Sequence, residues 1–348
     1  MAIVEAARTT AVTGGVDTHL DLNVAAALDS IGGLLGVEEF PTTAAGHEKL
    51  LCWLAGFGEV ARVGVEGTGS YGAGLARYLR AAGTEVVEVD RPNRQARRRT
   101  GKTDTVDAIE AARAAQGGRA LGAPKTRDGN VEAIRALVVA RRSARDTRIK
   151  TMNQIRHLGF TAPDQLRQRL AGVSRSLLAK RAASLRPRAD QGTVIFATTT
   201  ALRALGRRVL ALDEEAKQID KILDDLVRAT APELLAVYGV GTDTAAALLV
   251  AAGDNPDRLR SEPAWAHMCG VAPIEASSGK TKRYRLNRGG NRHANAALWR
   301  IVITRMSSDP RTQAYVATRT EEGLTKGEII RVLKRYVARD VYRYLRPA

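Results

Sequence analysis

The chain has 348 residues, of which 44% are hydrophobic and 26% are charged. This length and balance predict two or three domains with buried cores and exclude wholesale disorder. No run of about 18 apolar residues occurs, so no membrane span is expected, and residues 1–10 lack the pattern of a secretory signal. The two cysteines, Cys52 and Cys269, have no ligand spacing, which argues against a disulfide framework or a zinc site and favours a cytoplasmic location.

The charge is distributed unevenly along the chain. The formal net charge is +17, yet residues 1–90 hold 12 acidic and 5 basic side chains, whereas residues 91–348 hold 25 and 49. A basic excess of this size is typical of a protein that binds a polyanion such as nucleic acid. The alternative is a basic protein with no such partner. The acidic first segment indicates a site for cations, because divalent ions bind between carboxylates and phosphates.

The first third of the chain alternates between strand and helix patterns. Short apolar runs predict three strands that form an antiparallel meander, followed by a helix and then by further strands and helices. This order predicts a mixed α/β sheet with helices packed on it. The expected strands are residues 11–17, 22–28, 34–40, 61–67 and 84–90, and the expected helices are 43–55, 70–82 and one that begins near Thr103 or Asp104.

Two long helices are expected next, over residues 129–158 and 200–230. In the second, apolar residues recur at alternating steps of three and four, which is typical of a coiled coil. These residues are Leu202, Leu205, Val209, Leu212, Ala216, Ile219, Leu223 and Leu226. A helix-rich third part follows. The expected domains are therefore residues 1–122, a helical coiled-coil region over 123–230 and a mainly α-helical domain over 231–348.

Four acidic residues lie where a sheet would gather them. Asp17 and Glu66 each end an apolar run, and Asp104 and Asp107 share one face of the helix that begins beside them. Four such carboxylates can hold a pair of divalent ions about 4 Å apart, the arrangement used for in-line phosphoryl transfer. Oxygen ligands favour Mg²⁺ or Mn²⁺ over zinc. The bland alternative is that Asp104 caps the helix and Asp107 only complements its dipole.

Two neighbouring features are ambiguous. The segment Glu66–Gly72 holds three glycines before a helix, which either let a phosphate approach the backbone or let the strand and helix pack tightly. His19 follows Asp17 by two residues. It either contacts the metal site or the substrate, or it only faces solvent or packs against neighbouring side chains.

Several segments of the sequence resemble a known family. GVDTH, VEGTGSYGAGLARYL and RPNRQARRRTGKTDTVDA resemble the N-terminal DEDD, RuvC-like (RNase H-like) domain of the insertion-sequence "one-ten" transposases, which are relatives of the Piv and MooV invertases. The segment from GVGTDTAAALLV to NRHANAALWR is similar to that family's C-terminal transposase domain. Leu20 departs from the family pattern, where a lysine follows the GVDTH-type motif.

The resemblance implies a function. Asp17, Glu66, Asp104 and Asp107 would form a metal-binding tetrad, and a serine in the segment ASSGK would be the nucleophile on DNA, with Ser278 favoured and Ser277 as the alternative. It further implies guidance by a structured bridge RNA that pairs with target and donor double-stranded DNA. Tetramers would form composite active sites from two protomers, joined here by the coiled coil.

The residues around the serines are of the types that bind phosphate groups. No acidic residue occurs between Ala276 and Ser308, and a basic run leads directly to Asp104. The Gly239–Gly241 turn resembles a helix–hairpin–helix that would offer N–H groups to a phosphate, with a glycine C-cap as the alternative. The candidate nucleic-acid contacts are Arg91, Arg94, Arg97, Arg98, Arg99, Lys102, Lys280, Lys282, Arg283, Arg285, Arg288 and Arg292.

The sequence is compatible with three functions. The first is an RNA-guided DNA recombinase that passes through a covalent serine–DNA intermediate with Mg²⁺ at the tetrad. The second is a metal-dependent junction nuclease that hydrolyses DNA with water. The third is a nucleic-acid-binding protein without catalysis.

Overall fold

The structure is a computed structural model, which describes residues 11–89, 103–118, 120, 122–255 and 258–345. The chain divides into two compact units, one formed by residues 1–128 and 252–260 and the other by residues 129–251 and 261–348. The three domains expected from the sequence, with boundaries at residues 122 and 230, stay a prediction. Within the described residues, no helix is long and apolar enough to cross a membrane.

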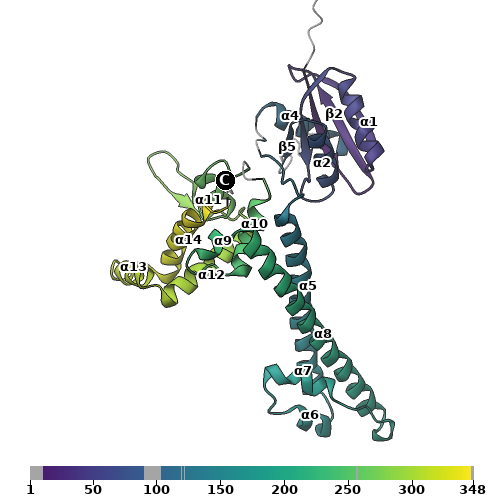
Figure 1. The fold of residues 1–348 in the computed structure, drawn as a ribbon, viewed down its shortest axis with the longest axis vertical. Helices are drawn as coiled ribbons and strands as arrows, with labels where there is room; N and C mark the ends of the chain where they lie inside the picture. Colours follow the sequence, from purple (N-terminus) through teal and green to yellow (C-terminus); the bar gives the residue numbers. More distant parts are fainter. Residues whose placement is uncertain (1–10, 90–102, 119, 121, 256–257, 346–348) are drawn as a thin grey trace, which may run out of the picture. The chain divides into compact units, whose positions relative to one another are not determined.

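The first unit is built on a mixed sheet with the order β3-β2-β1-β4-β5 (Figure 1). Strands β3, β2 and β1 pair antiparallel, and β1, β4 and β5 pair parallel, which confirms the expected meander and the mixed sheet. The bounds are β1 Ala11–Thr18, β2 Leu22–Leu28, β3 Leu34–Pro41, α1 Ala44–Ala55, β4 Glu59–Glu66, α2 Ala73–Ala81, β5 Val86–Val89 and α4 Asp104–Gln116.

Helices cover both faces of this sheet. One face carries the larger apolar core, in which Leu50 and Leu54 of α1 and Leu75 of α2 pack on the valines of β1 and β4. The other face is covered by α4, whose buried residues are almost all alanine. Short side chains on both surfaces let this helix lie close to the strands, and this packing positions the acidic site described below.

A return segment, residues 252–260, completes this unit. The Asn255 side chain donates a hydrogen bond to the carbonyl oxygen of Pro124 (3.0 Å). The guanidinium of Arg258 pairs with the Glu88 carboxylate on β5 (3.2 Å), which also accepts a hydrogen bond from Thr68 (2.6 Å). The sheet is therefore tied to a part of the chain more than 120 residues further on.

The second unit begins with a long helical hairpin. Helices α5 and α8 pack along each other, which confirms the two long helices expected from the sequence. Leu202 and Val209 of the predicted seam are buried inside the chain against α5, α6 and α7, and Leu205 packs beside them. The joining of protomers by this seam stays a prediction. The bounds are α5 Asn130–Phe160, α6 Asp164–Leu170, α7 Arg175–Ala183, η1 Ala189–Gln191 and α8 Thr193–Thr230.

The remainder of the second unit is mainly helical, as predicted, and its described residues include a short β-hairpin. Helices α11 and α12 pack on α14, which begins with a capping box formed by Thr325 and Glu328. The bounds are α9 Pro232–Ala236, α10 Thr242–Ala252, α11 Glu262–Met268, β6 Ile274–Glu275, β7 Tyr284–Arg285, α12 Arg292–Ser308, α13 Pro310–Glu321 and α14 Lys326–Tyr342.

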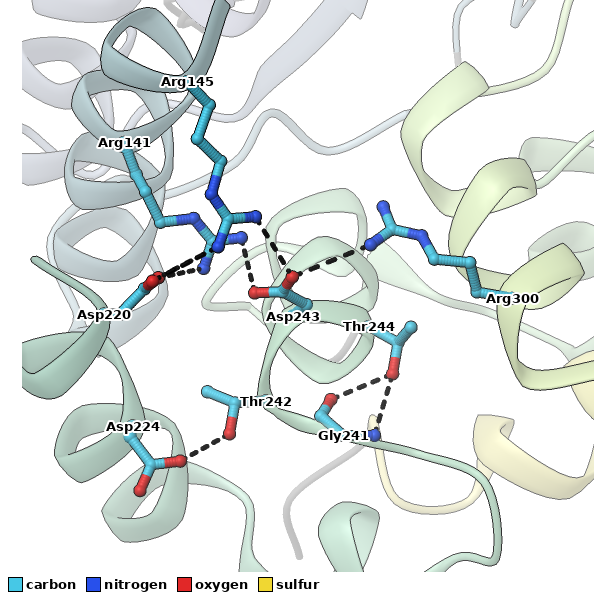
Figure 2. A network of polar contacts seen from close by, with 9 residues as sticks. All are labelled: Arg141, Arg145, Asp220, Asp224, Gly241, Thr242, Asp243, Thr244 and Arg300. Atoms are coloured by element: carbon cyan, nitrogen blue, oxygen red, sulfur yellow. Dashed lines mark hydrogen bonds and ion pairs between the residues drawn. The ribbon is translucent and has the colours of Figure 1, made fainter. Parts of the chain in front are cut away.

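An ion-pair network ties the base of the hairpin to this helical part (Figure 2). Arg141 and Arg145 of α5 both pair with Asp220 of α8 and with Asp243 of α10; the Arg141 distances are 3.0 and 2.5 Å. Arg300 of α12 approaches Asp243 at 3.7 Å. Arg141 is only 9% exposed, so its charge needs these partners. Burial tends to raise the pKa of Asp243, but the two α5 arginines outweigh it and hold the pKa below its usual value.

Candidate functional site

Parallel strands place two of the predicted acids at one edge of the sheet. Val16 pairs with Val65, so Asp17 and Glu66 follow side by side at the ends of β1 and β4. Gly15 and Gly64, two residues earlier on each strand, face α4. Because side chains alternate along a strand, Asp17 and Glu66 lie on this same face.

Helix α4 brings the other two acids to this edge. Its N-cap is Thr103, whose hydroxyl accepts a hydrogen bond from the N–H of Val106, and Asp104 and Asp107 occupy the first turn. A methyl group on Gly15 would lie 2.1 Å from the backbone nitrogen of Ala112, so the helix sits directly on the strand. This close packing of α4 on β1 places the first turn of the helix next to Asp17.

His19 also joins the acidic cluster. Its Nε2 lies 3.2 Å from a carboxylate oxygen of Asp17 and 3.5 Å from one of Asp104. One ligand atom from each of the three residues can be chosen so that all lie within 4.8 Å of one another. The Nε2 atom is shielded from solvent and makes no hydrogen bond within the described residues. Of the two alternatives for His19, the structure favours contact with the acidic site.

The electrostatics of the cluster favour a bound cation. Burial raises the pKa of Asp17, and the nearby charges of Asp107 and Asp104 raise it further, while His19 opposes them. These three aspartates therefore repel one another in a partly buried place. A divalent ion would relieve that repulsion, and the shielded Nε2 of His19 offers a further ligand. The donor set fits Mg²⁺ or Mn²⁺, and the nitrogen suits Mn²⁺ better than Mg²⁺.

The glycine-rich segment after β4 serves packing. A methyl group on Gly72 would meet the carbonyl oxygen of Glu66 at 2.7 Å, and Gly67 has a φ of +68° beside the Thr18 hydroxyl. That hydroxyl donates a hydrogen bond to the Glu66 carbonyl (2.9 Å), which fixes the ends of β1 and β4 together. Close backbone packing is the alternative that these contacts favour.

The two candidate serines lie on the β6–β7 hairpin of the second unit. Ser278 and Thr281 exchange backbone hydrogen bonds, each of 3.1 Å, around a two-residue turn in which Gly279 has a φ of +56°. The Ser277 hydroxyl donates to the Glu275 carboxylate (2.8 Å) and accepts from the N–H of Arg283 (3.3 Å). The Ser278 hydroxyl has no hydrogen-bond partner within the described part of the chain, and Ser278 is exposed.

The predicted nucleic-acid contacts divide into two groups. The first run, Arg91, Arg94, Arg97, Arg98, Arg99 and Lys102, lies outside the described residues. The second group lies on and after the serine hairpin, and every member is exposed to solvent: Lys280, Lys282, Arg283, Arg285, Arg288 and Arg292.

The Gly239–Gly241 turn precedes α10 and is occupied by local contacts. The N–H of Gly241 donates to the Thr244 hydroxyl (3.0 Å), which donates in turn to the Gly241 carbonyl (2.9 Å) (Figure 2). Gly239 has a φ of +82° against α12. The N–H of Gly241 is thus occupied by Thr244 at the start of α10, which argues against a phosphate contact there; because α9 ends at Ala236, these contacts of Gly241 are not the predicted C-cap.

Sequence reasoning missed two features. One is the pair Gly15 and Gly64, which seats α4; the signal was present, since both glycines share a face of the sheet and α4 has alanine at 108, 111, 112 and 115. The other is the Arg141 network, whose members lie on four helices, with about 80 residues between Arg141 and Asp220 and about 100 between Arg141 and Asp243, so it left no local pattern in the sequence.

Comparisons with known proteins give two family matches. Residues 14–158 match a family model of DEDD type described as a transposase of IS110, and residues 231–317 match one described as "Transposase IS116/IS110/IS902 family". The first range holds all four acids and the second holds both serines. The chain is also similar to the "Insertion element IS110 uncharacterized 43.6 kDa protein" of Streptomyces coelicolor, with 30% identity over 156 residues. That match covers 42% of this chain and 38% of the relative's length.

Proposed function

Because the chain belongs to the IS116/IS110/IS902 family of transposases, we propose that it is an RNA-guided DNA recombinase of an insertion element. The observation that carries this proposal is the convergence of Asp17, Asp104 and Asp107, with Glu66 beside them, within the part of the chain that matches the DEDD model. The net charge of +17 supports binding to nucleic acid.

In this proposal the acidic site holds a divalent ion. Asp17, Glu66, Asp104 and Asp107 would be its ligands, and His19 would add a nitrogen. A bound Mg²⁺ would supply positive charge to a scissile phosphate and stabilise its transition state. The carboxylates would orient that phosphate, while Thr18 and the seat of α4 hold the carboxylates in place.

Ser278 would be the nucleophile. Its hydroxyl is exposed, without a hydrogen-bond partner in the described chain, whereas the Ser277 hydroxyl is held by Glu275 and Arg283. In the proposed step a bond forms between Ser278 Oγ and phosphorus, the bond from phosphorus to a deoxyribose oxygen breaks, and the proton of the hydroxyl passes to the departing oxygen. The phosphodiester energy is kept in the serine–DNA bond, so the strand can be rejoined by the reverse reaction.

Guidance and assembly complete the proposal. A structured bridge RNA would pair with target and donor DNA, and protomers would assemble as a tetramer in which the acidic site of one faces the serine of another. The half-buried residues Leu212, Ala216 and Ile219 of α8 are available to contribute to a coiled coil between protomers.

The test is a search for a covalent adduct. The protein is mixed with the RNA that flanks its element, labelled target and donor duplexes and Mg²⁺, then denatured without proteolysis. We expect label to migrate with the protein in the wild type and in Ser277→Ala, and to be lost in Ser278→Ala and in Asp107→Asn. Protein-free cleaved DNA that persists in Ser278→Ala would contradict the proposal and favour a water-using nuclease. DNA binding without Mg²⁺-dependent cleavage would favour a binding protein.

A further inference from the structure

A cavity of about 700 Å³ lies beside the serine hairpin, between the segment 270–273, β7 with the loop that follows it, and helices α12 and α14. Among the described residues that line the cavity, five are basic and none is acidic. The five are Arg285, Arg288, Arg331, Lys334 and Arg335. Such a one-signed lining attracts an anion.

Most of this positive charge lacks a carboxylate partner. Arg335 forms a bidentate ion pair with Glu262, so its charge is already neutralised and its role is structural. Arg331 comes no closer to a carboxylate than 3.9 Å, and Arg285 and Arg288 have no carboxylate partner within the described part of the chain. A bound anion would therefore offset the positive charge that no described carboxylate neutralises.

Lys334 adds a charge in an unfavourable place. Its Nζ donates a hydrogen bond to the Asn295 side chain (2.9 Å), and Asn295 is itself fixed by donating to the carbonyl of Cys269 (2.8 Å). Burial, and then the nearby charge of Arg331, lower the pKa of Lys334. A phosphate between Lys334 and Arg331 would relieve their repulsion, as phosphates do at clusters of basic residues.

The remaining wall is apolar and suits a base. Val271, Pro273 and Val332 line the cavity, and Tyr284 and Leu286 do so with 66% and 59% of their surface exposed. A tyrosine ring that is open to solvent is the kind of surface on which nucleobases stack. The volume lies within the range of small-molecule pockets, which is sufficient for one nucleotide.

The hairpin connects this cavity to the proposed nucleophile. Ser278 pairs with Thr281 in an isolated bridge, and the chain then runs four residues to Arg285 of β7 at the cavity. At about 3.3 Å per residue this distance is about 13 Å. At about 3.4 Å per stacked nucleotide, 13 Å corresponds to about four nucleotides of one strand.

We propose that this cavity binds a nucleotide of the DNA strand that Ser278 attacks, a few positions from the cut. The base would stack on Tyr284 and lie against the apolar wall, and its phosphate would contact Arg285, Arg331 and Lys334. The proposal rests on the proposed function, because it takes Ser278 as the residue that acts on DNA.

The test measures binding by the full chain carrying Ser278→Ala, so that no covalent step contributes. The probe is a fluorescein-labelled DNA strand of about twelve thymidines, a length within the site sizes of single-strand binders, and anisotropy is followed across a salt series. We expect Tyr284→Ala and Arg331→Gln each to weaken binding about fivefold or more. Only Arg331→Gln should also reduce the slope of log K against log salt, by about 0.7. Arg311→Gln removes the same charge from exposed α13 and is the matched control.

Three outcomes would overturn the inference. The first is that Tyr284→Ala and Arg331→Gln bind like the control while the thermal unfolding of all three is unchanged. The second is that the same two variants weaken binding of the corresponding RNA strand and not of the DNA. The third is that a DNA strand with 5-iodouracil placed one to six positions from the cut crosslinks to residues other than those of the cavity. Absence of the covalent adduct from the wild-type chain, with binding at the cavity intact in the Ser278→Ala chain, would instead contradict the proposed function alone, so the two failures are distinguishable.

Discussion

Replacing Gly15 with alanine tests how the acidic site is built. The new methyl group would lie 2.1 Å from the backbone nitrogen of Ala112 and 2.4 Å from the backbone oxygen of Ala108. Ordinary contact begins near 3.4 Å, so α4 must move away from β1 by about 1.3 Å. Neither backbone atom can turn aside. Overpacking of this kind costs about 1–3 kcal/mol of stability.

The same shift would carry Asp104 and Asp107 away from Asp17. Metal–ligand distances tolerate only about 0.2 Å of change, so a displacement of about 1.3 Å removes these carboxylates from a shared ion. We expect Gly15→Ala to bind Mn²⁺ at least about tenfold more weakly than the wild type, which corresponds to about 1.4 kcal/mol. Titration calorimetry with MnCl₂ measures the affinity, and thermal unfolding measures the stability.

Gly14→Ala is the matched control. Its methyl group would point to the opposite face of the sheet and meet the end of the Leu54 side chain at 2.9 Å. It should therefore cost stability without changing Mn²⁺ affinity. The reasoning is refuted if Gly15→Ala folds and binds Mn²⁺ as tightly as Gly14→Ala. A wild-type chain that binds no Mn²⁺ would refute the metal site itself.

Three further predictions concern the second unit and the thiols. The folded-state pKa of Asp243 is lowered, so its contribution to stability is complete above about pH 4 and is lost as the pH falls through that lowered pKa; Asp243→Asn should cost about 1–3 kcal/mol at neutral pH and flatten the acid limb of a urea-unfolding series. Cys52 is exposed, whereas Cys269 is buried and its pKa is raised by burial; iodoacetamide should alkylate Cys52 alone in the native protein, as mass spectrometry of the peptides would show. Thr325→Ala removes the hydroxyl that accepts a hydrogen bond from the N–H of Glu328 at the start of α14, while the backbone N–H of residue 325 still donates to the Glu328 carboxylate, so unfolding in urea should show a loss of about 1 kcal/mol.

The sheet was predictable because its strands carry local signals. Residues 11–17, 22–28 and 34–40 each alternate or run apolar between turn residues, and the structure places β1, β2 and β3 within one residue of those bounds. The apolar seam of α8 was equally predictable from its heptad spacing, but the spacing does not say which surface the seam packs against. Here Leu202 and Val209 meet helices of the same chain.

The acidic cluster was predictable in its members and not in its geometry. Strand ends and a helix start explain why Asp17 and Asp104 approach each other, yet the place of the His19 ring depends on a loop that carries no period. The sequence indicated only some of the basic residues that line the cavity. Arg285 follows the serines in a stretch without acidic residues, so it was a candidate from the sequence. Arg331 and Lys334 lie on α14 and reach the cavity only through tertiary packing.

The return segment of the first unit constrains the order in which the protein can be completed during synthesis. Glu88 emerges early, but its partner Arg258 and the Asn255 side chain that binds Pro124 are made only after the entire α5–α8 hairpin. A chain released after residue 128 would hold every strand of the sheet and all four acids, yet it would lack these contacts. The contacts of the sheet unit with residues 252–260 therefore form late although its strands are translated first, and no single proteolytic cut between residues 129 and 251 would leave the whole unit on one fragment.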